Sequence, residues 1–401
     1  MSVTNQPTNL ASNIWKYTVF LITHKRPFMS IFGVYLLTLP GATPKSIGLT
    51  LLAGYLAGFF FEIPSGYIAD KIGHKQALVF SKISLLISTL LYLFGTSVSY
   101  FVVGAVFLNF AISFHSGTGT AFMHETLRGL GREKEYSKVM GRVSSIGFAI
   151  PIALIVLIPF LVSISFRVPF AVVALLDILG LVSAIFLVVP ERTKEEIKEI
   201  GVHNFWAVVR ECYRFGFFKY AVFLSLVMGL ILSVSGYKDV YQAFLGVPII
   251  YYGIFWATSR VLVSLLLLIN DKVKTYLSFH QFLGLKLLFS LAILFGLGLF
   301  PIPFVIVPLL IFASAFNWSF KETKNHYLLD IIERSNFKAT ILSIESLLSS
   351  IVAAVFGFIL GYIITQGSYP SAFLFLAFSS LALLSVSFGF ILFQSYHRHH
   401  V

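Results

Sequence analysis

Apolar residues dominate this chain in long runs, which short polar segments interrupt. A helix needs about 20 mostly apolar residues to cross the hydrocarbon core of a bilayer. The one long polar connection, residues 190–204, falls near the midpoint of the chain. By this criterion we place twelve spans, six on either side of that connection, at 14–39, 47–68, 77–95, 100–126, 139–162, 168–189, 213–236, 248–269, 277–299, 303–328, 339–365 and 370–394.

Short matches between the two halves indicate an internal repeat. Asp70-Lys71 is followed 201 residues later by Asp271-Lys272, and HETLRGLGR (124–132) is followed 202 residues later by HYLLDIIER (326–334). Parallel repeats with a solute site between them are a transporter architecture. We therefore predict an all-α membrane protein of two pseudo-symmetric six-helix bundles, with a tail at 1–13, bundles at 14–189 and 213–394, a central loop at 190–212 and a second tail at 395–401.

Composition supports a membrane protein and excludes several other classes. Hydrophobic residues make up 57% of the chain and charged residues 11%, against about 25% charged in a typical soluble protein. The net charge of +12 does not indicate a nucleic-acid partner, because the basic residues fall mainly in alternate short loops. Such loops face the cytoplasm, which predicts that both termini are cytoplasmic. The single cysteine, Cys212, excludes an internal disulfide, and residues 1–13 lack the features of a signal peptide.

No pattern in the chain indicates catalysis or direct use of ATP. The phosphate-binding pattern G-x-x-x-x-G-K-(S/T) is missing, and nothing matches a catalytic triad or a metalloenzyme motif. We therefore expect a protein that is not an enzyme and that has neither a cofactor nor a bound metal.

A basic cluster, His24-Lys25-Arg26, interrupts the first apolar run. A span that began after the cluster would have 12 residues, or about 18 Å, which is too short for a core of about 30 Å. We therefore expect the cluster to lie near the middle of the span, where Pro27 favours a kink. Because charge facing lipid is costly, either Lys25 or Arg26 should line a solute cavity while its neighbour pairs with a carboxylate. The alternative is an interfacial helix at 14–24 followed by a short, tilted span.

Acidic residues within the spans are the candidates for proton coupling. Asp177 is the only acid well inside the spans of the first half, so it is either the partner of a span-1 cation or a proton site. Glu322, His326 and Asp330 share one helix face and could relay protons, because histidine titrates near neutral pH. The alternative for this row is a set of charges spread near the cytoplasmic end of a helix.

Three further residues complete the candidate site. Glu345, early in the eleventh span, is a candidate carboxylate for proton coupling and a possible partner for Lys321. Lys321 would add positive potential on the second bundle. Gln242 could hydrogen-bond a solute, although an interfacial glutamine fits the pattern equally well.

The segment GYIADKIGHK (66–75), between the second and third spans, resembles the signature loop of the major facilitator superfamily, G-x-x-x-D-(R/K)-x-G-(R/K)-(R/K). It departs from that pattern at His74, and the longer EIPSGYIAD (62–70) is a form common in bacterial members. In the family the loop acid meets the N-terminus of the eleventh span and a cation on the fourth, here 339–341 and Arg128. The resemblance thus implies a latch on the cytoplasmic side, against the alternative of a solvated turn. Its residues would be Gly66, Asp70, Lys71, Gly73, Lys75 and Arg128.

The resemblance implies a monomeric secondary transporter of the bacterial inner membrane, whose partners are a small solute, protons and lipid. Positive potential from Lys25, Arg26 and Lys321 favours an anionic solute, such as an organic acid or a carboxylate siderophore. One alternative is an exporter of lipophilic drugs, although the fifth span lacks the G-P-x-x-G-G element of the drug/proton antiporters. Another is a membrane receptor or assembly partner that does not transport.

Overall fold

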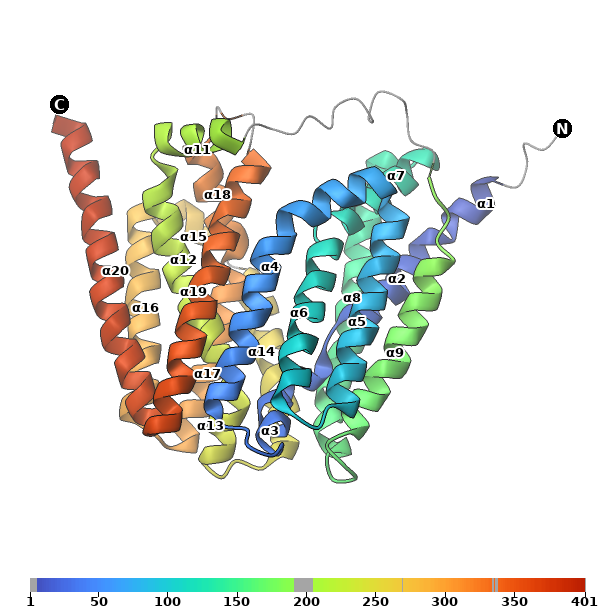
Figure 1. The fold of residues 1–401 in the computed structure, drawn as a ribbon. Coiled ribbons are helices and arrows are strands. Elements are labelled where there is room, and N and C mark those ends of the chain that lie inside the picture. The colour runs from blue at the N-terminus through green and yellow to red at the C-terminus, as the bar shows by residue number, and fades with distance from the viewer. Residues whose placement is uncertain (1–5, 191–204, 269, 334, 336–337, 401) are drawn as a thin grey trace. The chain divides into compact units, whose positions relative to one another are not determined.

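The computed structural model describes residues 6–190, 205–268, 270–333, 335 and 338–400, so the predicted central loop lies largely outside the described residues. The described part is almost entirely helical and contains no strand (Figure 1). Its first helices are α1 (Gln6–Ala11), α2 (Asn13–His24), η1 (Pro27–Ser30), α3 (Phe32–Leu37), α4 (Pro44–Ile72), α5 (His74–Phe94), α6 (Val98–His115), α7 (Thr118–Gly129), η2 (Glu133–Glu135), α8 (Tyr136–Leu161) and α9 (Val168–Ile185). They are followed by α11 (Phe205–Arg214), α12 (Phe217–Ser235), α13 (Lys238–Phe244), η3 (Ile249–Tyr251), α14 (Tyr252–Leu267), α15 (Asn270–Tyr276), α16 (Phe279–Leu299), α17 (Pro303–Ser319), α18 (Lys321–Ile331), α19 (Lys338–Gln366) and α20 (Tyr369–His400).

Most of the predicted spans correspond to single long helices. Among the described residues, ten helices are long and apolar enough to cross a membrane. An eleventh span results if α17 and residues Thr323–Ile331 of α18 are counted together across the bend of 41° between them. The remaining predicted span, 14–39, is broken. Its first helix, α2, ends at His24, and the backbone is extended at Lys25. The short helices η1 and α3 then follow. The kink predicted at Pro27 is replaced by a break in the helix at Lys25 and Arg26, and Pro27 is the first residue of η1.

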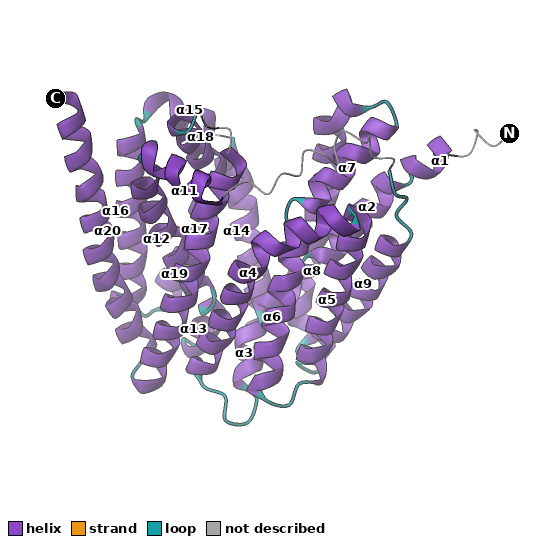
Figure 2. Cartoon of the chain, turned by 45° about the horizontal axis from the view of Figure 1, so that its top comes forward, coloured by secondary structure: helices purple, strands orange, loops and turns teal. Residues whose placement is uncertain are grey.

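Contacts between Cα atoms group the chain into two compact units. The first comprises Met1–Tyr35 and Leu56–Val202, and the second comprises Leu36–Tyr55 and His203–Val401. In the first unit α5 packs against α9, and in the second α16 packs against α20 (Figure 2). The third and sixth predicted spans of each half therefore pair in the same way, as expected of a repeat. The domain boundaries predicted at 14–189 and 213–394 remain a prediction.

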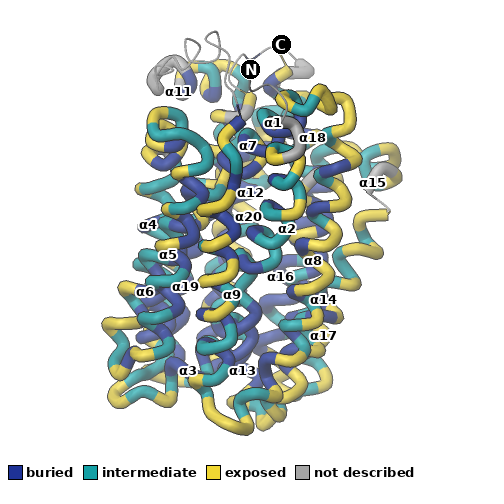
Figure 3. Tube along the Cα trace, turned by 90° about the vertical axis from the view of Figure 1, so that its right-hand side faces the viewer, coloured by how far each residue is buried: buried dark blue, intermediate teal, exposed yellow. Residues whose placement is uncertain are grey.

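Large apolar side chains are exposed along helices of both units. Phe304 is 92% exposed, Val386 74% and Leu175 64%. Buried and exposed positions alternate along individual helices, as the colours of Figure 3 show. In a soluble protein such exposure would be unfavourable, but it is suited to a chain whose sides contact lipid.

The loop between α4 and α5 consists of one residue, Gly73. Its φ of +102° lies in a region that side-chain-bearing residues rarely adopt, so glycine permits the direct reversal from Ile72 to His74. Gly66, the first of the predicted latch residues, lies inside α4, and a Cβ atom there would meet nothing within 4 Å. Its part in the latch remains a prediction.

Candidate functional site

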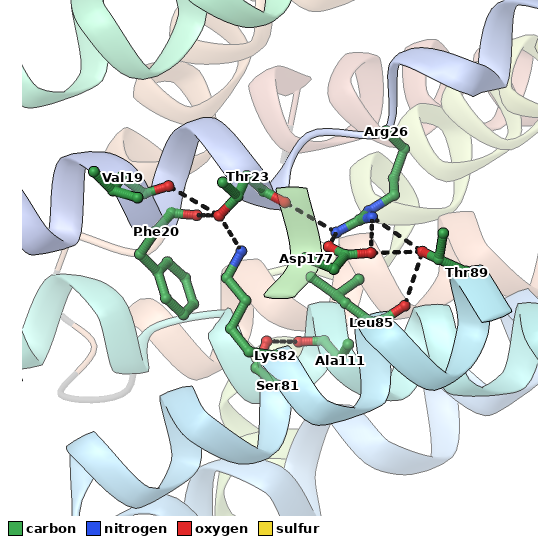
Figure 4. A network of polar contacts seen from close by, with 10 residues as sticks. All are labelled: Val19, Phe20, Thr23, Arg26, Ser81, Lys82, Leu85, Thr89, Ala111 and Asp177. Atoms are coloured by element: carbon green, nitrogen blue, oxygen red, sulfur yellow. Dashed lines mark hydrogen bonds and ion pairs between the residues drawn. The ribbon is translucent and has the colours of Figure 1, made fainter. Parts of the chain in front are cut away.

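Arg26 occupies the break in the first membrane segment and holds it to two other helices (Figure 4). Its guanidinium forms two parallel bonds with the Asp177 carboxylate of α9, Nη1–Oδ2 at 2.8 Å and Nη2–Oδ1 at 2.7 Å. Nη2 also donates to the Thr23 carbonyl oxygen near the end of α2, at 3.1 Å. The Thr89 hydroxyl of α5 donates to Asp177 Oδ2 at 2.6 Å. The side chain of Arg26 therefore connects α2, α5 and α9.

The pair between Arg26 and Asp177 is almost completely buried. The exposed fractions of the two side chains are 9% and 0%. Bidentate, charge-assisted bonds of this kind are among the strongest polar contacts in proteins. Of the two roles that we left open for Asp177, partner of a span-1 cation is the one seen in this conformation. A role in proton transfer remains a prediction.

Lys82 of α5 lies next to this pair and is itself completely buried. Its Nζ atom donates to the Thr23 hydroxyl at 2.7 Å and lies 4.4 Å from the centre of the Phe20 ring. A Cβ atom at Gly180 would lie 2.2 Å from the Thr23 hydroxyl oxygen and 2.8 Å from Nζ, so a glycine in α9 makes room for both groups. No carboxylate of the described residues lies within 4.0 Å of Nζ.

Two histidines lie near Lys82 in the first unit. The rings of His24 and His115 are 4.3 Å apart, centre to centre. The Tyr17 hydroxyl is 3.3 Å from Nε2 of His115, while Nδ1 of His24 is buried without a hydrogen-bond partner. His24 belongs to the span-1 cluster, whereas His115 is a titratable group that we did not predict from the sequence.

The second unit also contains a buried ion pair. Lys324 Nζ of α18 lies 2.5 Å from Glu345 Oε2 of α19, and Glu345 is 2% exposed. The Ser349 hydroxyl donates to the other carboxylate oxygen at 3.3 Å. The partner that we suggested for Glu345 was wrong, because Lys321 is exposed at the start of α18 and Lys324, almost one turn later, makes the contact.

A second buried lysine, Lys286 of α16, lies in the same unit and is 4% exposed. Its Nζ atom donates to Asn317 Oδ1 at 3.4 Å and lies 4.8 Å from the centre of the Phe316 ring. Like Lys82, it has no carboxylate within 4.0 Å among the residues that the structure describes. Its polar partner is a neutral oxygen and its other neighbour is the face of an aromatic ring.

Lys82 and Lys286 occupy corresponding places in the repeat. Helices α5 and α16 are both 21 residues long, and the lysines are the ninth and the eighth residue of their helix. Each unit therefore combines a buried ion pair with a buried lysine that lacks a carboxylate partner in the described part of the chain. Burying an ammonium group in this way is unfavourable unless another group compensates its charge.

The sequence does contain a signal for these two lysines, although we did not predict them as site residues. Both fall inside predicted spans, 77–95 and 277–299, and an ionisable residue within a span indicates a functional site. They are also 204 residues apart, close to the offset of the repeat.

Two other predicted solute contacts, Lys25 and Gln242, have different neighbours from the pair between Arg26 and Asp177. Lys25 Nζ lies 4.1 Å from the centre of the Phe148 ring, so it points to a different neighbour from Arg26. Gln242 lies on the short helix α13 and is 5% exposed, and its side-chain oxygen has no hydrogen-bond partner.

The acid–histidine–acid row predicted on α18, Glu322, His326 and Asp330, does not contain a buried histidine. His326 and Asp330 are exposed, and Asp330 lies 3.1 Å from Lys274 of α15. The side chain of Glu322 lies outside the described residues. The proton relay through this row remains a prediction.

His74, which replaces a basic residue in the signature loop, lies between two acids. Its Nδ1 atom is 3.1 Å from Glu125 Oε2 of α7, and its Nε2 atom is 3.5 Å from Asp70 Oδ1. Lys71 is exposed, Lys75 is half-buried, and Arg128 lies in the last turn of α7. The latch between Asp70 and 339–341 remains a prediction. No group of three or more His, Cys, Asp or Glu residues in the described ranges could hold a metal ion.

Comparisons with known proteins give a family model that matches most of the chain and solved structures of similar fold. The family model described as Major Facilitator Superfamily matches residues 18–320. A mutant of the nucleoside transporter NupG has a similar structure, with a TM-score of 0.73 at 15% identity, over 95% of this chain and 99% of that one. A bacterial homologue of the human lysosomal transporter Spinster, in an inward-facing and occupied conformation, gives a TM-score of 0.69 at 12% identity, over 96% of both chains. A search of curated proteins found no match.

Proposed function

The chain belongs to the major facilitator superfamily and has the fold of a secondary transporter, and we propose that its solute is an anion rich in carboxylate groups, moved by alternating access. The observation that carries this proposal is the buried lysine of each unit, Lys82 and Lys286, next to an ion pair that is already satisfied. An anionic solute would supply the compensating charge that the described residues do not supply. Lys25, Arg26, Lys321 and Gln242 are proposed as further solute contacts.

We propose that protons move with the solute through the two buried carboxylates. Protonation of Asp177 or Glu345 would remove the charge that holds Arg26 or Lys324, and the released cation could then bind the anion. A proton and an anion taken up together keep the number of buried charges constant, which avoids the cost of an uncompensated charge. His326 with Glu322 is the second proposed proton route.

Transport of metabolites into proteoliposomes tests this proposal and does not require a solute to be chosen beforehand. Purified protein is reconstituted, an inside-alkaline pH gradient is imposed, and a bacterial metabolite extract is added. We expect mass spectrometry of the vesicle contents to show accumulation of carboxylate compounds, which disappears when the gradient is removed. Asp70→Asn, which disrupts the proposed latch, should slow accumulation more than it weakens solute binding.

Three outcomes would contradict the proposal. Gradient-driven extrusion of neutral or cationic lipophilic compounds from the vesicles, in exchange for inward-moving protons, would favour a drug exporter. Binding without accumulation or exchange would favour a receptor that does not transport. A normal rate in Asp70→Asn, at normal protein abundance, would remove the latch from the mechanism.

We further propose that both termini face the cytoplasm of a bacterial cell. The test places single cysteines at Lys134, Lys272 and Ser368 in a Cys212→Ser background. A membrane-impermeant thiol reagent should label the first two positions only from the cytoplasmic side and the third only from the periplasm, because Lys and Arg concentrate in cytoplasmic loops. Labelling of all three from one side would contradict the predicted topology.

A further inference from the structure

The second unit has a groove of about 750 Å³ between α12 and α20. This volume lies within the range of sites that bind ligands, about 300–1,000 Å³. Its lining includes large apolar residues of both helices, among them Val222, Leu226, Leu383, Val386 and Phe390. The groove is separate from the buried lysines and ion pairs described above.

The groove lies at the depth of the bilayer and is open at its side. Its apolar lining belongs to the candidate membrane spans Phe217–Ser235 and Tyr369–Ser395. Val386 is 74% exposed, Phe390 51% and Val222 43%. Because these apolar surfaces are accessible within a membrane-spanning segment, lipid is the solvent that reaches them.

One end of the groove is polar and basic. Lys219, in the first turn of α12, contributes to the lining together with Tyr213 and Gln394. Helix α11 leads into this end, and it buries Val208 and Cys212 while exposing Arg210 and Arg214. An amphipathic helix with basic residues on its exposed face is typical of the membrane surface.

The length of the groove matches one leaflet of a bilayer. Along α20 the lining extends from Ala382 to Gln394, thirteen residues that span about 18 Å at a rise of 1.5 Å per residue. Half of a hydrocarbon core is about 15 Å thick. A chain that begins at the basic end would therefore reach the other end of the groove near the middle of the membrane.

We infer that this groove is a binding site for an anionic phospholipid of the surrounding bilayer. The phosphate lies at Lys219, which lines the groove, and near the exposed Arg214, which follows the lining residue Tyr213. One acyl chain lies along Val222, Leu226 and Val386. Basic pockets beside membrane helices are suited to anionic head groups, and each basic residue near the surface strengthens binding about fivefold. The inference does not depend on the solute proposed above.

Native mass spectrometry of the detergent-purified protein tests this inference, with phosphatidylglycerol and phosphatidylethanolamine of identical acyl chains as probes. We expect phosphatidylglycerol to bind the wild type more tightly. Lys219→Gln/Arg214→Gln should weaken its binding by about 10–30-fold, and leave the zwitterionic lipid little changed. Lys134→Gln/Lys138→Gln, which removes two exposed basic residues from the first unit, is the matched control and should have little effect.

A second variant distinguishes binding of the lipid in the groove from electrostatic binding of an anionic lipid to any basic surface of the protein. Val386→Trp fills the apolar part of the groove and retains every basic residue, and its highly exposed position should tolerate the larger side chain. It should abolish tight binding of phosphatidylglycerol. Unchanged binding in this variant would place the lipid elsewhere and overturn the inference. Equal binding of both lipids by the wild type, or an equal loss in the Lys134/Lys138 control, would show that the basic end does not select an anionic head group.

Discussion

Arg26→Gln should lower the free energy of unfolding by about 3–5 kcal/mol, because it leaves the buried Asp177 carboxylate without its counterion. The variant also loses the bond from the guanidinium to the Thr23 carbonyl oxygen, next to the break in the first membrane segment. Unfolding of the purified protein in mixed micelles with increasing SDS measures the change. The midpoint for this variant should move to clearly lower SDS.

A double-mutant cycle separates the ion pair from other effects of the substitution. Asp177→Asn alone should also destabilise, since it leaves the Arg26 charge uncompensated. The double variant Arg26→Gln/Asp177→Asn should lose less stability than the sum of the two single variants, because it leaves no lone buried charge. Arg132→Gln, which breaks an exposed pair with Glu135, is the control and should change little. Strict additivity in the cycle would contradict a coupled pair.

The sequence predicted that one basic residue of the span-1 cluster could pair with Asp177, but not which residue it is. A basic cluster in an apolar run that is too short to form two spans predicts that one basic residue meets a carboxylate, and Asp177 was the only acid well inside the spans of its half. The choice between Lys25 and Arg26 could not be made, because helical spacing gives directions only along an unbroken helix. The extended backbone at Lys25 removes that regularity and lets Arg26 reach α9.

The error at Lys321 has a related cause. We treated 303–328 as one continuous span, whereas the chain breaks at Phe320 between α17 and α18, and the two segments are bent by 41°. Such a bend changes which residues of the second segment face a neighbouring helix, so Lys324 rather than Lys321 meets Glu345. Apolar periodicity predicted that a helix crosses here, but it contains no information on the direction of the helix after a break.

The burial and the contacts of Lys82 and Lys286 could not be predicted from the sequence, even where the predicted spans are correct. A lone lysine in an apolar run is compatible with a side chain that reaches the membrane surface and with one that is buried. Only the three-dimensional arrangement shows that Thr23 and Asn317 receive the two ammonium groups and that no described carboxylate is near. The apolar pattern shows that a lysine lies within a span, but it does not show whether the side chain is buried or reaches the membrane surface.

Lys82→Met should leave the free energy of unfolding unchanged or raise it by up to about 4 kcal/mol, in contrast to Arg26→Gln. The lysine has no carboxylate partner among the described residues, so its removal leaves no buried charge alone. Methionine fills a similar volume with a flexible, apolar chain. Part of the gain is offset by the lost bond to the Thr23 hydroxyl, which contributes about 1 kcal/mol. The same expectation applies to Lys286→Met, which loses the bond to Asn317.

If these lysines bind the solute, the stabilised variants should be the inactive ones. A contact between an ammonium group and an anion contributes about 1.5–3 kcal/mol, so each substitution should weaken anion binding roughly tenfold or more. The SDS midpoint and the gradient-driven accumulation of carboxylates are measured on the same preparation of each variant, with Lys134→Gln as the control. A residue that lowers stability yet is required for transport is retained for function, since packing alone would favour methionine. Strong destabilisation together with normal transport would assign Lys82 and Lys286 a structural role and overturn the proposed anion site.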